Sequence, residues 1–124
     1  MRYLVATDSV HTTAAACDYL DPRLEDDDFV SVVSVPGTDG RDAEDALNVV
    51  TARLAGRADI TTEQFLTDGD PASGILSAAN NADIDVIVIG PHAGDPDSGP
   101  ELGGTARRIL EGANVPVVVV PLSV

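Results

Sequence analysis

The chain has 124 residues, enough for one domain with a substantial core. Hydrophobic residues make up 44% of it, which excludes a disordered chain, while aromatic residues make up only 3%, so the core must be aliphatic. Twenty-one acidic residues against seven basic ones give a net charge of −14, a balance that repels nucleic-acid phosphates and anionic membranes and argues against both as partners.

The acidic residues are dispersed along the chain, and all seven basic residues are arginine. This pattern predicts a halophilic protein, because high salt screens the repulsion between surface charges; an acidic mesophilic protein is the alternative. The single cysteine excludes an internal disulfide and favours a reducing compartment. No apolar run approaches the roughly 20 residues needed to span a bilayer, and no signal pattern precedes the first strand, so we expect a cytoplasmic protein.

The first third of the chain predicts a strand, a helix and a second strand. Arg2 to Thr7 (RYLVAT) is a short apolar run and predicts a buried strand. A helix is expected over Thr12 to Leu20, with Cys17 as a small buried hydrophobe, and Pro22 ends it. Phe29 to Val35 (FVSVVSV) is rich in β-branched residues and predicts the second strand.

The middle of the chain predicts two further helices around a strand. Asp39 can cap the first of them, and Gly56 is placed to stop it. Its apolar stripe at helical spacing consists of Ala43, Ala46, Leu47, Val50 and Leu54. Ile60 to Leu66 (ITTEQFL) mixes apolar and polar residues and predicts an edge strand. Asp70 and Pro71 then form a strong helix start. The buried face of that helix is expected to consist of Ala72, Ile75, Leu76 and Ala79.

The last third predicts two strands separated by a glycine-bearing loop and a short helix. Asp85 to Gly90 is apolar almost throughout, as a strand buried on both faces should be, and Val115 to Pro121 predicts the last strand. The helix between them places apolar residues at helical spacing, namely Ala106, Ile109, Leu110 and Ala113. A glycine loop that runs from a strand into a helix start can cradle a phosphate; a plain surface crossover loop is the alternative.

The regular alternation of strands and helices predicts one α/β domain, a five-stranded parallel sheet with helices on both faces. In such a sheet, ligands bind beyond the carboxyl ends of the strands, at the point where strand order reverses. The two candidates for that place are the turn at Thr7 and Asp8 and the loop that begins at Gly90.

These two segments resemble the universal stress protein family, and the resemblance covers essentially the whole chain, 1–124. Family members open with an apolar strand ending in Asp-Gly-Ser or a close relative, here LVATDS from Leu4 to Ser9, and carry a fourth strand ending in glycine, here VIVIG from Val86 to Gly90. Their nucleotide-binding branch then shows Gly-x2-Gly-x9-Gly-Ser/Thr, a helix and a Pro-Val-Val-Val strand, here Pro116 to Val120. The resemblance implies a Rossmann-like, adenine nucleotide alpha hydrolase-like fold with strand order 3-2-1-4-5.

The glycine motif fits this chain in two registers. Counting back from Pro116 gives correct spacing, with an alanine in place of the second glycine, and aligns Gly90, Ala93, Gly103 and Gly104. Counting from the glycine–threonine pair leaves Gly90 one residue too distant, and aligns Gly94, Gly104 and Thr105. A one-residue bulge in the loop would reconcile the two registers.

By this resemblance the chain binds an adenine nucleotide, ATP or AMP, with Mg²⁺ as a further candidate. Thr7 and Asp8 would lie against the adenosine, and the backbone near Val35 would meet the adenine edge. The segments that would hold ribose and phosphates are Gly90 to Gly94, which includes His92 and Ala93, and Gly103 to Thr105. A carboxylate such as Asp8 can accept from a ribose hydroxyl or adenine amine, although a simple helix cap is the alternative. His92 could touch a phosphate or face solvent.

The charges near the predicted site act in opposite directions. Asp95, Asp97 and Glu101 place three carboxylates in the loop that would meet a triphosphate, which is unfavourable unless Mg²⁺ or salt screens them. Arg107 and Arg108 lie at the start of the following helix, where positive charge is disfavoured. They either clamp phosphate or pair with neighbouring acids.

The sequence shows no recognisable catalytic motif, so we do not expect an enzyme; slow ATP hydrolysis is the alternative. A chain without lysine has no Walker A loop, and no Cys/His cluster has metal-ligand spacing. Two functions remain: a sensory or regulatory adenine-nucleotide-binding protein of the stress response, or a protein-interaction module that binds no nucleotide. In both, the resemblance implies a homodimer joined through Val117 to Val120, which would otherwise be an exposed apolar edge.

Overall fold

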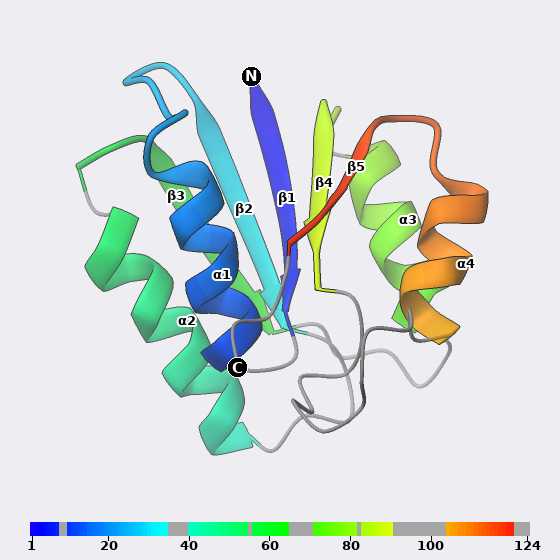
Figure 1. Cartoon of the computed structure of the whole chain (residues 1–124), viewed down its shortest axis with the longest axis horizontal. Helices are drawn as coiled ribbons and strands as arrows, with labels where there is room; N and C mark the ends of the chain where they lie inside the picture. Colours follow the sequence, from blue (N-terminus) through cyan, green and yellow to red (C-terminus); the bar gives the residue numbers. More distant parts are fainter. Residues whose placement is uncertain are drawn as a thin grey trace.

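The computed structural model describes residues 1–7, 10–34, 40–54, 56–64, 71–81, 83–90 and 104–120. Within these ranges strands and helices alternate along the chain (Figure 1). The strands are β1 (Arg2–Thr7), β2 (Phe29–Ser34), β3 (Asp59–Gln64), β4 (Val86–Ile89) and β5 (Val117–Val119). The helices are α1 (Val10–Leu20), α2 (Gly40–Leu54), α3 (Pro71–Asn81) and α4 (Gly104–Gly112).

The strands form one parallel five-stranded sheet in the order β3-β2-β1-β4-β5, which confirms the predicted fold and strand order. In the central pair, Tyr3 lies beside Val86 and Val5 lies beside Val88. From β1 the chain steps outward through β2 to β3, and it then crosses to β4 on the other side of β1. Strand order therefore reverses between β1 and β4, the place where ligands bind in sheets of this type.

Helices cover both faces of the sheet, as expected: α1 and α2 lie on one side and α3 and α4 on the other (Figure 1). Neighbouring residues of β1 show why the middle of this strand is apolar, because successive side chains of a strand point to opposite faces and both faces are covered. Val5 packs in the core shared with α1 and α2, while Leu4 packs in the core shared with α3 and α4. Each is 1% exposed.

Several predicted helix boundaries are confirmed. α3 begins at Pro71, where a residue without a backbone N–H leaves no donor unpaired. α2 ends at Leu54, and Gly56 adopts a φ of 79°, the left-handed conformation that commonly follows a helix. α1 begins at Val10 rather than at the predicted Thr12.

The end of the chain differs from the prediction in two respects. Leu110 was expected on the apolar stripe of α4, but it is 40% exposed, whereas Ile109 is 1% exposed. Adjacent residues lie about 100° apart around a helix, so the narrow buried face holds Ala106 and Ile109 and leaves Leu110 outside it. The last strand spans Val117–Val119 and so begins later than Val115, while residues 121–124 lie outside the described part.

The two outer strands are β3 and β5. β3 was predicted as an edge strand, and its residues Asp59, Thr61 and Thr62 are exposed, as expected for a strand with one open side. The strand spans Asp59–Gln64, while the last predicted residues of this strand, 65 and 66, lie outside the described part. Among the helices that the structure describes, none has the length and apolar character that crossing a membrane requires.

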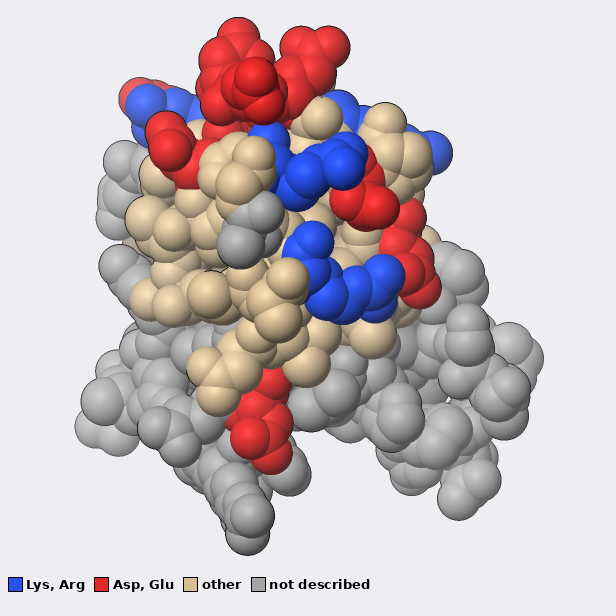
Figure 2. Space-filling view, turned by 90° about the vertical axis from the view of Figure 1, so that its left-hand side faces the viewer, with Lys and Arg blue, Asp and Glu red and all other residues tan. Residues whose placement is uncertain are grey.

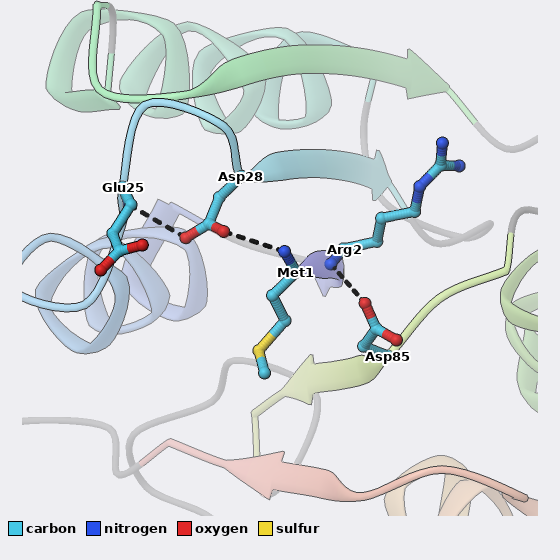
Figure 3. Close-up of polar contacts among 5 residues, drawn as sticks. All are labelled: Met1, Arg2, Glu25, Asp28 and Asp85. Atoms are coloured by element: carbon cyan, nitrogen blue, oxygen red, sulfur yellow. Dashed lines mark hydrogen bonds and ion pairs between the residues drawn. The ribbon is translucent and has the colours of Figure 1, made fainter.

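Polar contacts join the amino ends of the strands (Figure 3). The Met1 amino group donates to Asp28 Oδ1 at 2.9 Å, and the Glu25 backbone N–H donates to Asp28 Oδ2 at 2.9 Å. The Arg2 backbone N–H donates to Asp85 Oδ2 at 2.7 Å. The hydrogen bonds from Glu25 and from the amino group hold the pKa of Asp28 below its usual 3.8, and the Asp28 carboxylate raises the pKa of the amino group above 8.0.

In Figure 2, arginine side chains lie next to acidic ones, and further acidic side chains gather at the top of the view. Arg53 of α2 donates to the carboxylate of Asp18 on α1. Arg57 lies 3.5 Å from the carboxylate of Asp21 and also donates to its backbone carbonyl at 2.6 Å. These contacts join the carboxyl-terminal ends of the two helices, where positive side chains are favoured by the helix dipole.

Candidate functional site

The carboxyl ends of β1 and β4 meet at one edge of the sheet, where strand order reverses. The two strands pair in parallel, with Val5 beside Val88. Continuing this register brings Thr7, the last residue of β1, level with Gly90, the residue after β4. The two segments that the sequence singled out as candidates therefore begin side by side.

Two helices begin at this same edge (Figure 1). α1 begins at Val10, shortly after β1, and α4 begins at Gly104. The first turn of a helix presents backbone N–H groups without partners in the helix, and the helix dipole makes this end positive. Neither helix carries an acidic residue in its first turn. The starts of α1 and α4 at this end of the sheet therefore favour an anion there.

Three buried threonines connect the first turn of α1 to both strand ends. The hydroxyl oxygens of Thr7 and Thr13 lie 2.7 Å apart in a buried hydrogen bond. Thr12 lies against Gly90: a Cβ atom added at Gly90 would be 3.0 Å from Thr12 Cγ2 and 3.1 Å from Thr12 Oγ1. Thr7, Thr12 and Thr13 are 1%, 2% and 0% exposed. We refer to these three residues as the threonine cluster.

Sequence reasoning missed the roles of Thr12 and Thr13. It took Thr12 as the start of the helix, and a helix boundary residue is not expected to be buried. The available signal was a pair of adjacent hydroxyl residues followed by three alanines, shortly after a polar strand-to-helix turn. The hydrogen-bonding partner of Thr13 and the glycine beside Thr12 follow only from the fold.

The predicted site residues fall into two groups. Thr7, Gly90 and Gly104 lie at the carboxyl edge of the sheet, and Thr105 lies there as the second residue of α4. The Thr7 hydroxyl is buried and hydrogen-bonded to Thr13, so its predicted contact with adenosine stays a prediction. The predicted residues outside the described part of the chain are Asp8, Val35, His92, Ala93, Gly94 and Gly103.

The charged residues of the predicted site are described only in part. Arg107 and Arg108, the fourth and fifth residues of α4, are exposed near the start of the helix, as the sequence indicated. The three loop carboxylates of Asp95, Asp97 and Glu101 lie outside the described residues. Both interpretations of the arginines, phosphate contact and pairing with acids, therefore remain.

Groups that could carry out chemistry are few in the part of the chain that the structure describes. There, no three His, Cys, Asp or Glu side chains gather as metal ligands would. Cys17 is 1% exposed in the core between α1 and the sheet, as predicted. Burial raises the pKa of its thiol above 9.0, so the group stays protonated at neutral pH and is a poor nucleophile.

Comparison with known proteins agrees with this geometry. A sequence profile of the Universal stress protein family matches residues 1–121. No curated protein matches the chain in sequence. Among solved structures, a universal stress protein from Archaeoglobus fulgidus is similar at 22% identity and a TM-score of 0.71, over 97% of this chain and 98% of that chain.

Two similar structures contain nucleotides. One is a universal stress protein in complex with cAMP, at 18% identity and a TM-score of 0.67, with 99% of this chain and 98% of that chain covered. The other is the universal stress protein from Archaeoglobus fulgidus in complex with dAMP, at 20% identity and a TM-score of 0.63, with 97% of each chain covered. At such identities the similarity shows the fold, whereas the profile match spans almost all of the sequence. The chain therefore belongs to the universal stress protein family.

Proposed function

We propose that the protein binds an adenine nucleotide, ATP or AMP, at the edge where the carboxyl ends of β1 and β4 meet. The observation that best supports this is the meeting there of the two strand ends at the reversal of strand order, with the starts of α1 and α4 at the same end of the sheet. The nucleotides in the similar structures, cAMP and dAMP, both contain adenine and phosphate, which supports the same ligand class for this chain.

Different segments of the chain would contact different parts of the nucleotide. Gly90, which packs against Thr12, lies where the chain leaves β4 toward the proposed site. In this proposal, Asp8 accepts hydrogen bonds from the ribose, and the backbone near Val35 meets the adenine. The ribose and phosphates would lie at Gly90 to Gly94 and Gly103 to Thr105, toward the start of α4. Mg²⁺ bound with ATP would screen the phosphates from the loop carboxylates.

The proposed role is sensory or regulatory, in the stress response, and not enzymatic. A buried, protonated Cys17 is consistent with a reducing compartment, and we propose a cytoplasmic location. We also propose a homodimer joined through Val117 to Val120. β5 is an outer strand of the sheet, and pairing with a second copy would cover its open side. Association without nucleotide is the second candidate function, because the open side of β5 is separate from the proposed nucleotide site at the ends of β1 and β4.

Calorimetric titration with Mg-ATP and with AMP, in low salt and in molar KCl, tests the proposal. We expect saturable binding, and Asp8→Asn should weaken it about tenfold or more because a charged hydrogen-bond acceptor is lost. Asp26→Asn is the matched control, since it removes the same charge at an exposed position near the amino ends of the strands and should leave affinity unchanged. Absence of heat at millimolar nucleotide would leave only the association role.

A further inference from the structure

The first turn of α1 contacts the ends of both central strands. Thr13 is hydrogen-bonded to Thr7 at the end of β1, and its neighbour Thr12 lies against Gly90 immediately after β4. Two adjacent residues of α1 therefore contact the ends of the two strands between which strand order reverses. Any ligand bound at this edge would be held by chain segments that leave β1 and β4 directly beyond these contacts.

The side chain of Thr12 fits against Gly90 because residue 90 has no Cβ. The side chain of Thr12 occupies the space in which a Cβ of residue 90 would lie, with Thr12 Cγ2 at 3.0 Å and Oγ1 at 3.1 Å. Both distances are shorter than ordinary carbon contacts of about 3.5–4.0 Å. Thr12 is β-branched, belongs to a helix and is 2% exposed, so it has few other rotamers to adopt. An added Cβ at position 90 would therefore require Thr12 to move by a few tenths of an ångström.

We propose that Thr12 is a positioning residue for the nucleotide site: by filling the space that Gly90 leaves open, it fixes the direction in which the chain leaves β4. The inference rests on the proposed function, because the segment after Gly90 is the one proposed to hold ribose and phosphates. Thr12 acts through Gly90 and does not touch the nucleotide. A larger residue at position 90 would push α1 and the exit of β4 apart, and a smaller one at position 12 would leave the exit unsupported.

A double-mutant cycle tests this inference in the full chain. The variants are Gly90→Ala, Thr12→Ala and the double variant, each measured for free energy of unfolding and for ATP affinity. Gly90→Ala should weaken ATP binding about tenfold and lower stability, and adding Thr12→Ala should recover both, because the added methyl then occupies the vacated space. Thr12→Ser in the Gly90→Ala background is a milder rescue that removes only Cγ2, the closest atom.

Two further variants separate positioning from general stability. Thr12→Val keeps the branched shape and should keep ATP affinity within about threefold even if loss of the buried hydroxyl lowers stability. Gly112→Ala is the matched control at the opposite end of α4, where an added Cβ would meet Leu76 Cδ1 at 2.8 Å. It should leave ATP affinity unchanged whatever its effect on stability.

The outcomes distinguish this inference from the proposed function. Additive effects of Gly90→Ala and Thr12→Ala on both stability and affinity would overturn the size-matched pair. If the two substitutions have non-additive effects on stability but ATP affinity is the same in every folded variant, the positioning role is overturned. Wild-type protein that binds no adenine nucleotide would overturn the proposed function and with it the role of Thr12 in binding, and the stability cycle would then test the packing pair alone.

Discussion

Gly56 follows the end of α2 with a φ of 79°, and a Cβ added to it would meet no atom within 4 Å. The need for glycine there comes from the backbone, since the left-handed conformation brings a Cβ close to the following carbonyl of the same chain. Gly56→Ala should therefore lower the free energy of unfolding by about 1 kcal/mol. Gly56→Asn should cost less, because asparagine tolerates this conformation, and urea unfolding of both variants checks the order. Equal costs would point to a different cause.

Gly90 and Gly112 show that the shortest distance does not decide the cost of an added methyl group. The contact at Gly112 is nominally closer, 2.8 Å to Leu76 Cδ1 against 3.0 Å to Thr12 Cγ2 at Gly90. The leucine methyl is the end of a flexible, partly buried side chain and can rotate away. The threonine is buried and stiff. Replacement of Gly90 is therefore the more disruptive change, which is why Gly112→Ala serves as its control.

Asp28 gives stability a defined pH dependence. Its pKa is lowered by the Glu25 N–H and by the Met1 amino group, so its contribution is present above its usual pKa of 3.8 and is lost as the pH falls through the lower folded value. The pKa of the Met1 amino group is raised, so its contribution is complete below 8.0 and is lost as the pH rises through the higher folded value. The contact therefore stabilises the protein most between these limits.

Asp28→Asn tests this window. The variant should be less stable than wild type by roughly 1 kcal/mol at neutral pH, because a largely buried acceptor of two hydrogen bonds is weakened. The difference should vanish in acid, where the wild-type carboxylate is protonated. Urea unfolding across the pH range measures it, with Asp26→Asn, exposed in the same turn, as the control. A difference that persists unchanged into acid would contradict the assignment.

Apolar packing and surface ion pairs both join α1 and α2, but they contribute very differently to the free energy of unfolding. Arg53 and Asp18, joined by a hydrogen bond, have side chains 42% and 69% exposed, so solvent screens their attraction. Leu54, the next residue of α2, is 1% exposed in the core. Arg53→Ala should cost under about 1 kcal/mol, less in molar KCl, whereas Leu54→Ala should cost about 2–5 kcal/mol at any salt. Urea unfolding at two salt concentrations decides this, and a cost for Arg53→Ala that did not fall with salt would show a role beyond its charge.

How well each element could be predicted depends on whether its determinants are local. β1 and β4 were predictable because strands buried on both faces are apolar at every position, and the start of α3 because Pro71 favours the first position of a helix. The end of α2 was predictable from Gly56 alone. Each of these signals lies within a few residues of the feature it specifies.

The features that could not be predicted depend on distant partners. The burial of Thr12 follows from its contact with Gly90, which no local pattern reveals. The exposure of Leu110 depends on how wide a face of α4 the sheet and α3 cover. The location of the candidate site was predictable, because the topology brings the ends of β1 and β4 together. The register of the glycine motif was not predictable, since two alignments fit the same loop.

The surface carries the charge that composition indicated. Among the acidic residues whose exposure the structure describes, Asp28 is buried and the others are exposed. The whole chain has 21 acidic residues and seven arginines, so ion pairs with arginine can neutralise a third of the acids at most. Repulsion among the remaining carboxylates opposes the compact state and is strongest at low ionic strength, where the Debye length is long.

Stability should therefore rise with salt. We expect the free energy of unfolding to increase from low salt to molar KCl, because screening removes more repulsion between acids than attraction within the few ion pairs. Replacing the exposed pair Asp26 and Asp27 with asparagine should raise stability at low salt and flatten its salt dependence. Thermal unfolding of both proteins over a KCl series provides the measurement, with sorbitol as an uncharged cosolvent control. Wild-type protein that is most stable at low salt would contradict a halophilic origin for this surface and would place the acidic residues among those selected for solubility or partner binding.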